Sequence, residues 1–205
     1  MKKLSARWIP RFLTPDKRQK RVTYSREALD CMSSNKQILF LRIVTMDETW
    51  VHHFDPETKR QSQQWKHMHS PPPVKCRKIA SAGKVMASVF WDCDGVVMIE
   101  YLEKGHTVTG QYYAQQLERL KQAIMEKRPG KFSAGVLLLH DNAPAHSAKV
   151  AVAMATKCQF ELLPHQPYSP DLAPSDYYMF SQLKIDLKGC VFSTDNDVME
   201  AVDMF

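Results

Sequence analysis

The chain has 205 residues, of which 44% are hydrophobic and 24% are charged, and its net charge is +6. This length and composition predict one domain with a sizeable core, together with an arm. No apolar run approaches the roughly 18 residues that cross a bilayer, and Arg7, Pro10 and Arg11 interrupt any signal-peptide core. These features exclude a membrane-spanning class and predict an intracellular protein without a membrane partner.

The positive charge lies in two segments. Residues 1–26 contain nine Lys or Arg and one acid, and residues 55–84 contain seven and two, so the remainder of the chain is acidic. Basic segments around an acidic body suit a protein that binds phosphates and holds a metal ion, although solvated charge is the alternative for each segment. The basic run at residues 17–21 also resembles a nuclear-import signal, so we expect the protein in the nucleus.

The first 30 residues are predicted to form a basic linker or arm, and residues 31–205 the globular domain. Prolines interrupt the arm. Thr14 can cap a helix that starts at Pro15 and runs toward Met32, because proline lacks the N–H that a helix start leaves unpaired.

An apolar run over residues 38–45 predicts a central strand that ends near Asp47, and residues 50–54 either continue it or begin a neighbour. The hydrophobic pattern then fails over residues 54–80, which are polar and basic and contain three consecutive prolines. A connection of this length is unusual inside a compact domain, so we expect an inserted functional loop.

A hairpin and a helix are predicted next. Two β-rich runs, 85–91 and 96–102, flank Asp-Cys-Asp-Gly, which is a strong hairpin signal. A helix follows, capped by Thr109 and ended by Pro129. Its apolar residues keep helical spacing and are predicted to face the core: Tyr113, Leu117, Leu120 and Ile124.

The second half alternates short apolar runs with helical segments. Residues 136–139 and 160–163 predict strands, whereas residues 148–155, residues 176–187 and a segment from Asp195 predict helices. With the earlier strands, this order predicts an α/β fold, a mixed five-stranded sheet with helices on its faces.

Three carboxylates lie at the ends of predicted elements. Asp47 follows the first strand, Asp141 follows the strand at 136–139, and Asp176 falls in the first turn of a helix for which Ser175 is a good N-cap. Because such ends can converge on one point, the three side chains are candidates for a divalent-metal site. Mg²⁺ needs only one or two carboxylates per ion, so the set can hold two ions that act on an in-line phosphoryl displacement.

Each aspartate also has a simpler interpretation. Asp47 and Asp141 can be turn formers at strand ends, and Asp176 can merely favour a helix start. Asp171 competes for the third position, although it lies between prolines in a loop.

Other polar residues flank these aspartates. Glu48 is expected to face solvent or to lie behind the metal ligands. His140 and His146 can touch DNA or orient a carboxylate, and structural hydrogen bonding is the simpler role. Asn142 is a candidate supporting group on the same turn.

The stretches around the aspartates resemble the mariner family of DNA transposases. They read Asp-Glu-Thr-Trp at 47–50, His-Asp-Asn-Ala at 140–143 and Tyr-Ser-Pro-Asp-Leu-Ala-Pro-Ser-Asp-Tyr at 168–177. The 34 residues between Asp141 and Asp176 are also characteristic of mariner elements. The resemblance extends over nearly the whole chain.

This resemblance implies a ribonuclease-H-like catalytic core in which Asp47, Asp141 and Asp176 are the catalytic residues and bind two Mg²⁺ ions, with Mn²⁺ as a substitute. It implies cut-and-paste transposition: DNA cleavage at terminal inverted repeats, then strand transfer into a TA dinucleotide, which integrates the DNA. In the family, the insert after the first catalytic strand is a clamp between two subunits. Residues 54–80, with the linker, would thus contact a second copy in a homodimer.

The chain also departs from the family. Its linker reads Trp-Ile-Pro-Arg-Phe-Leu at 8–13, where the family usually has Trp-Val-Pro-His-Glu-Leu. The helix-turn-helix domains that read inverted repeats are expected ahead of residue 1, and further helices after Phe205, so we interpret the chain as truncated. Two alternatives therefore remain: a catalytically silent, transposon-derived module that dimerises and binds DNA, and a stand-alone nuclease of the same fold.

Overall fold

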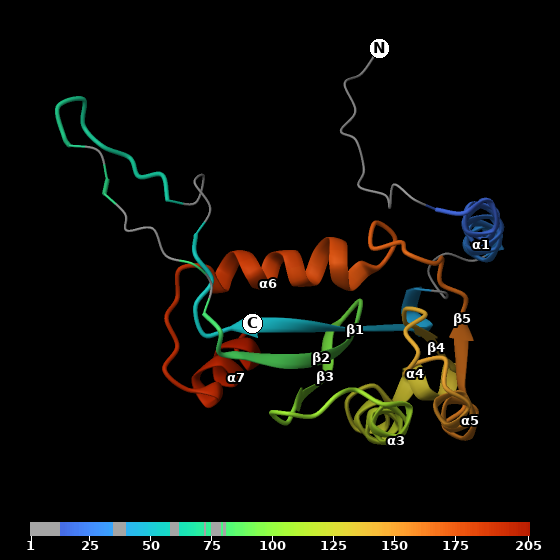
Figure 1. Cartoon of the computed structure of the whole chain (residues 1–205). Coiled ribbons are helices and arrows are strands. Elements are labelled where there is room, and N and C mark those ends of the chain that lie inside the picture. Colours follow the sequence, from blue (N-terminus) through green and yellow to red (C-terminus); the bar gives the residue numbers. More distant parts are fainter. Residues whose placement is uncertain (1–12, 35–39, 58–61, 72, 75–78, 80) are drawn as a thin grey trace, which may run out of the picture.

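A mixed sheet forms the centre of the chain. The computed structural model describes residues 13–34, 40–57, 62–71, 73–74, 79 and 81–205. Its five strands have the order β3-β2-β1-β4-β5 (Figure 1) and are β1 (Ile43–His52), β2 (Lys84–Asp92), β3 (Gly95–Leu102), β4 (Val136–Leu139) and β5 (Phe160–Leu163). The β1–β2 and β2–β3 pairs are antiparallel, whereas β1–β4 and β4–β5 are parallel. The predicted mixed five-stranded sheet is confirmed.

The β2–β3 hairpin follows directly from its turn residues. The Asp92 carboxylate accepts a hydrogen bond from the Asp94 N–H at 2.8 Å, which closes the turn locally. Gly95 then has a φ of 117°, a backbone conformation that residues with a Cβ atom rarely adopt. The hairpin predicted from the Asp-Cys-Asp-Gly sequence is confirmed.

The first strand is the main correction to the sequence prediction. Residues 40–42 are helical, and β1 begins at Ile43 and continues to His52, so Asp47 lies in the middle of the strand and not at its end. The reason is pairing: β2 lies alongside β1 from Thr45 to His52, whereas β4 pairs with β1 only as far as Thr45. Pairing with β2 makes the polar residues of β1 part of the strand, although the apolar run in the sequence ends before them.

Helices cover both faces of the sheet. The three on one face are α3 (Gly110–Lys127), α4 (Pro129–Ala134) and α5 (Lys149–Lys157), and the two on the other are α6 (Phe180–Leu187) and α7 (Asp195–Asp203). Figure 1 shows the sheet between α6 and the α3–α5 pair. Val44 and Met46 pack with α3 and α5, whereas Val51 packs with α6 and α7. Since side chains alternate along a strand, Asp47 faces α6 and Glu48 faces α3.

The predicted helix after the hairpin is confirmed as α3. The Thr109 side chain accepts a hydrogen bond from the Tyr112 N–H at 3.2 Å, and the predicted apolar stripe is fully buried. Pro129 follows the end of this helix and is also the first residue of the short α4, a position that suits proline. Helix α4 was not predicted, because Pro129 was interpreted only as a helix stop.

Helix α1 (Pro15–Ser34) confirms the predicted helix in the arm. Arg21 pairs with Asp171 at 3.1 Å, and the Lys17 ammonium lies 4.0 Å from the ring centre of Tyr168. These contacts attach α1 to the loop before α6. The predicted division at residue 30 falls inside α1, and the division itself stays a prediction.

The predicted insert at residues 54–80 is described only in part. Figure 1 shows its described portions extending away from the sheet, and they contain no helix or named strand. Trp65 and Met68 are fully exposed there. Contact of this insert with a second subunit stays a prediction.

No helix among the described residues is long and apolar enough to span a membrane.

Replacing Thr194 by Ala is expected to lower the free energy of unfolding by about 1 kcal/mol. The Thr194 hydroxyl accepts from the Asp197 N–H at 3.2 Å, and the Asp197 carboxylate accepts from the Thr194 N–H at 3.0 Å, so the pair caps α7. Urea unfolding measures the loss. Thr156→Ala, at an exposed position of α5, is the matched control and should change stability by less than about 0.5 kcal/mol. Equal losses in both variants would contradict the capping role.

Candidate active site

Three segments bring the predicted aspartates together. Asp47 lies in β1, Asp141 lies two residues beyond β4, and Asp176 lies in the first turn of the π-helix η1 (Ser175–Met179), which continues into α6. Thr45 pairs with Leu139 in the parallel register, so continuing by two residues places Asp47 level with Asp141. Neighbouring strands lie about 4.8 Å apart, and η1 packs against β1. The structure therefore gathers the three carboxylates that the sequence singled out.

The carboxylates are close enough to affect one another's ionisation. Burial raises the pKa of Asp47 to about 7; the Glu48 N–H opposes this shift, and the charges of Asp176 and Asp141 add to it. Burial also raises the pKa of Asp176, with a further contribution from Asp141. The carboxylates thus repel one another, although the Lys184 charge partly offsets this effect at Asp176.

Asp141 differs from the other two because it has strong hydrogen-bond donors. Burial alone would raise the pKa of Asp141, but the hydrogen bonds from His146 and from the Ala143 N–H outweigh burial and lower it. His146 donates at 2.6 Å and the Ala143 N–H at 2.9 Å. Asp141 is therefore the most readily ionised member of the group.

The carboxylate oxygens form an open set. Within the described part of the chain, the hydrogen bonds that Asp47 and Asp141 accept end on Oδ1 of each side chain and leave Oδ2 out of them. Within the described part of the chain, no group of three or more His, Cys, Asp or Glu side chains is arranged to hold a single metal ion. The aspartates therefore form a shared acidic region and not a closed cage.

Histidines support the acidic region from the α3 face. His146 also contacts Glu48 at 3.2 Å, and although burial disfavours its charged form, the hydrogen bonds to Asp141 and Glu48 raise the pKa of His146 to about 9. Burial, together with the nearby His146 charge, lowers the pKa of His140 to about 4. His140 hydrogen-bonds the Tyr113 hydroxyl at 2.9 Å. Both histidines are hydrogen-bonded, as predicted, and the partners of His146 are carboxylates.

The remaining predicted residues have other partners. The expectation that Ser175 caps the helix is wrong: the helix is preceded by Pro174, and the buried Ser175 hydroxyl accepts a hydrogen bond from Trp91 Nε1 at 3.0 Å. Asp171, the competitor for the third position, pairs with Arg21 of α1. Asn142 donates its side-chain N–H to the His165 carbonyl at 2.9 Å and so holds the following loop.

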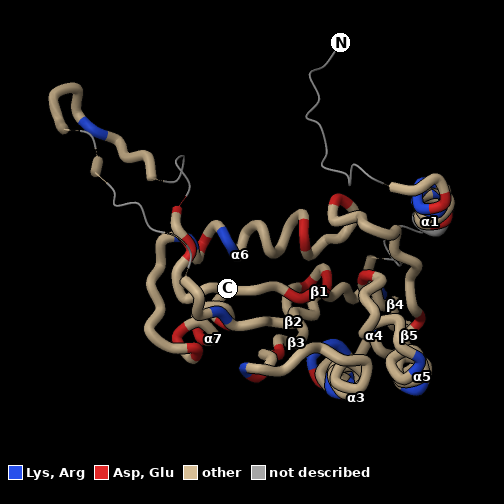
Figure 2. The backbone as a smooth tube through the Cα atoms, in the orientation of Figure 1, with Lys and Arg blue, Asp and Glu red and all other residues tan. Residues whose placement is uncertain are grey.

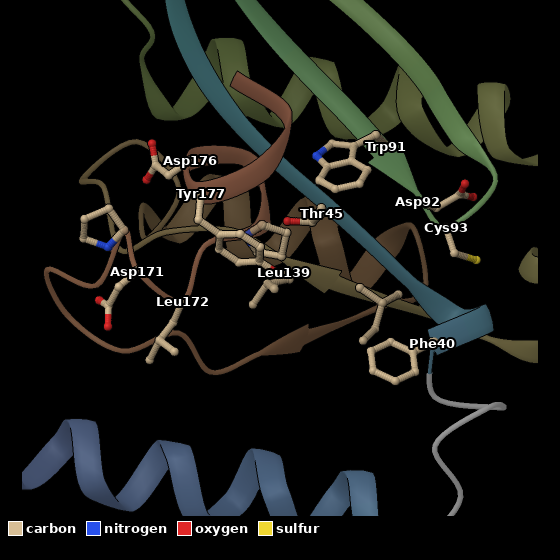
Figure 3. A pocket seen from close by; sticks show the side chains of 13 residues that line it. Phe40, Thr45, Trp91, Asp92, Cys93, Leu139, Asp171, Leu172, Asp176 and Tyr177 are labelled. Atoms are coloured by element: carbon tan, nitrogen blue, oxygen red, sulfur yellow. The ribbon is translucent and has the colours of Figure 1, made fainter. Parts of the chain in front are cut away.

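Two cavities adjoin Asp176. The larger has a volume of about 1060 Å³ and is largely apolar, with Trp91, Leu139 and Tyr177 among its lining residues (Figure 3). The other has about 390 Å³, lies between β1 and α6, and includes Thr49 and Lys184. Trp91 and Lys184 were not predicted to lie near the aspartates, because a pattern along the chain does not indicate which distant residues come close in the fold.

The chain matches known proteins over this region. The family described as Transposase (partial DDE domain) matches residues 55–134. The chain is 38% identical over 180 residues to the Mariner Mos1 transposase of Drosophila mauritiana, covering 86% of this chain and 50% of that protein. It is 31% identical over 206 residues to Histone-lysine N-methyltransferase SETMAR of Homo sapiens, covering 100% of this chain and 29% of that protein. The chain thus spans half or less of these curated relatives.

Solved structures show the same relationship in three dimensions. The Mos1 mariner paired end complex with Mn has a TM-score of 0.82 at 33% identity, and the alignment covers 100% of this chain and 59% of that chain. The paired end complex with Mg also has a TM-score of 0.82, at 32% identity, and the alignment covers 100% of this chain and 58% of that chain. The catalytic domain of Mos1 mariner transposase has a TM-score of 0.76 at 31% identity, covering 96% of this chain and 84% of that domain. This chain belongs to the mariner family of transposases, and its mixed sheet is the ribonuclease-H-like fold of their catalytic domain.

Proposed function

We propose that this chain is the catalytic domain of a mariner-like transposase, which cleaves DNA strands and transfers them with the help of divalent metal ions. The observation that carries the proposal is the convergence of Asp47, Asp141 and Asp176 from β1, the turn after β4 and η1. Burial and mutual repulsion raise the pKa of two of them, as expected where a cation is to be bound.

The donor set fits Mg²⁺. Mg²⁺ prefers oxygen ligands, uses one or two protein carboxylates, and completes its octahedron with water and substrate phosphate. An open group of aspartates suits that chemistry better than a closed cage does, and the Mos1 paired end complexes with Mg and Mn support the assignment. Two bound ions would activate the attacking oxygen and neutralise charge on the leaving 3′-oxygen.

The surroundings leave room for a DNA strand on both sides of Asp176. The groove between β1 and α6 contains the exposed Lys184, whose ammonium suits a backbone phosphate. On the other side, Trp91 and Tyr177 present aromatic surface in the larger cavity (Figure 3). The residues of this chain would therefore bind the strand, orient it across the aspartates and limit the access of water.

DNA is the proposed partner, and its charge complements that of the chain. Figure 2 shows Lys and Arg on α1, α3 and α5, and the net charge is +6. Transposon inverted repeats as substrates, TA dinucleotides as targets, and a homodimer through the linker and residues 54–80 form part of this proposal. Nuclear import through residues 17–21 does too, and transport of a fluorescent fusion would test it.

Plasmid nicking tests the function. The chain is expected to nick supercoiled plasmid with Mg²⁺ and to stop when EDTA is added. With a pre-cleaved transposon end that carries a free 3′-hydroxyl, it is expected to produce joined DNA. Nicking without joining would favour the stand-alone nuclease. Binding without nicking would favour the catalytically silent module.

Metal binding provides a second test that does not depend on DNA chemistry. Asp141→Ala is expected to weaken Mn²⁺ binding at least tenfold in isothermal titration, since it removes a metal ligand. Asp186→Ala is the matched control, because Asp186 is an exposed residue of α6 outside the acidic region. Unchanged Mn²⁺ binding in Asp141→Ala would refute the metal assignment.

A further inference from the structure

We infer that His146 is a positioning residue, which holds the Asp141 carboxylate in place for the metal by linking it to Glu48 of β1. The inference rests on the proposed function, because it takes Asp141 as a metal ligand. It adds a residue that would not touch DNA or metal itself, yet would set how well the site binds metal.

Asp141 needs such a support because the sheet does not hold it. Strand β4 has four residues and its pairing ends at Leu139, so Asp141 lies in an irregular segment. Two donors orient its side chain: the Ala143 N–H at 2.9 Å and His146 Nδ1 at 2.6 Å. Both bonds end on Oδ1, so they hold the carboxylate without using Oδ2.

His146 connects this turn to the strand that carries Asp47. Its side chain is 1% exposed, and its Nε2 lies 3.2 Å from Glu48 Oε1. Glu48 follows Asp47 directly in β1 and points to the opposite face of the sheet, toward α3. The imidazole therefore bridges two segments that each supply a carboxylate, and so fixes the position of one relative to the other.

The core holds the imidazole in turn. The His146 ring centre lies 4.2 Å from that of the fully buried Tyr113 in α3 and 5.2 Å from that of His140. The Tyr113 hydroxyl hydrogen-bonds His140 Nδ1 at 2.9 Å, so the two residues that pack against the His146 ring also hold each other in place. A purely structural histidine would need the packing alone. Here both ring nitrogens also meet carboxylates, and one of these carboxylates belongs to the candidate metal site.

The two ring nitrogens can be tested separately. An Asn side chain places its N–H₂ near the Nδ1 position and can keep the Asp141 bond, whereas Gln reaches the Nε2 position and can keep only the Glu48 bond. We expect His146→Ala to weaken Mn²⁺ binding in isothermal titration about 10–100-fold, the usual loss when a partner behind a metal ligand is removed. His146→Asn, which keeps the Asp141 bond but loses the link to Glu48, should recover part of that loss, and His146→Gln clearly less.

A matched histidine serves as control. His53 also bonds a carboxylate, Asp195 at 2.7 Å, but it does so beside α7. His53→Asn should leave Mn²⁺ affinity unchanged. Thermal unfolding in EDTA reports whether each variant is folded; if His146→Ala does not fold, the comparison of Asn with Gln decides the question.

Two results would overturn the inference: Mn²⁺ affinity of a folded His146→Ala within twofold of wild type, or equal affinities for the Asn and Gln variants. Absence of Mn²⁺ binding by the wild type would overturn it as well. Nicking by the wild type is measured separately. If wild type binds Mn²⁺ with the expected ranking of variants but never nicks DNA, the positioning role holds and the proposed function fails.

Discussion

Replacing Asp47 by Asn is expected to abolish Mg²⁺-dependent nicking and also to stabilise the metal-free protein, by roughly 2–4 kcal/mol above pH 7. The activity is lost because a neutral amide binds Mg²⁺ poorly. The stability rises because the variant no longer holds a half-buried negative charge beside Asp141 and Asp176. Asn keeps the size of the side chain, and its carbonyl oxygen can still accept from the Glu48 N–H.

The sign follows from proton uptake. Burial raises the pKa of Asp47 from 3.8 to about 7, so the folded wild type binds more protons than the unfolded chain between about pH 4 and pH 7. Its stability therefore falls as the pH rises through that window, and the group's penalty is largest above pH 7. The advantage of Asp47→Asn should accordingly be small near pH 4 and reach its full size near pH 8.

Urea unfolding in EDTA at pH 4, 6 and 8 measures this difference. Asp171→Asn is the matched control with the opposite sign, because Asp171 pairs with Arg21 at 3.1 Å and its replacement removes a favourable contact. Saturating Mg²⁺ should stabilise the wild type and leave Asp47→Asn unchanged. Equal stability of Asp47→Asn and wild type at pH 8 would show that the carboxylate is not under electrostatic strain.

Lys131→Met is expected to cost about 3 kcal/mol of stability, the second largest effect. The Asp92 side chain is fully buried at the end of β2, with Lys131 Nζ at 3.1 Å and Arg128 Nε at 3.4 Å from its Oδ2. The Lys131 ammonium also donates to the Ile43 carbonyl at 3.2 Å, so it joins α4 to β1 and to the hairpin. Methionine fills a similar volume, but the cation that then remains beside the buried Asp92 carboxylate is Arg128, whose Nε lies farther from Oδ2.

Chemical unfolding of single and double variants tests this ion pair. Lys131→Met combined with Asp92→Asn should recover part of the loss, since both buried charges are then gone. Lys157→Met is the control: Lys157 and Glu118 are an exposed pair at 3.4 Å and should contribute less than about 1 kcal/mol. A loss in Lys131→Met no larger than in Lys157→Met would contradict the buried pairing.

Local sequence signals predicted those elements whose causes are local. The hairpin turn, the Thr109 cap and strands β4 and β5 all agree with the predicted ranges, because turn chemistry, capping and short apolar runs act within a few residues. Prediction failed where distant residues decide. The polar half of β1 is a strand because β2 pairs with it, and the Ser175 hydroxyl is taken by Trp91 from another strand.

The same division applies to the candidate site. The spacing and surroundings of Asp47, Asp141 and Asp176 were enough to select these carboxylates and to indicate the family, because residue types and their order are properties of the chain itself. Only the folded structure decided that Asp47 is half-buried in mid-strand with a pKa near 7, and that His146 connects Asp141 to Glu48. Burial and contact depend on which distant segments pack together, so a linear pattern carries no direct record of them.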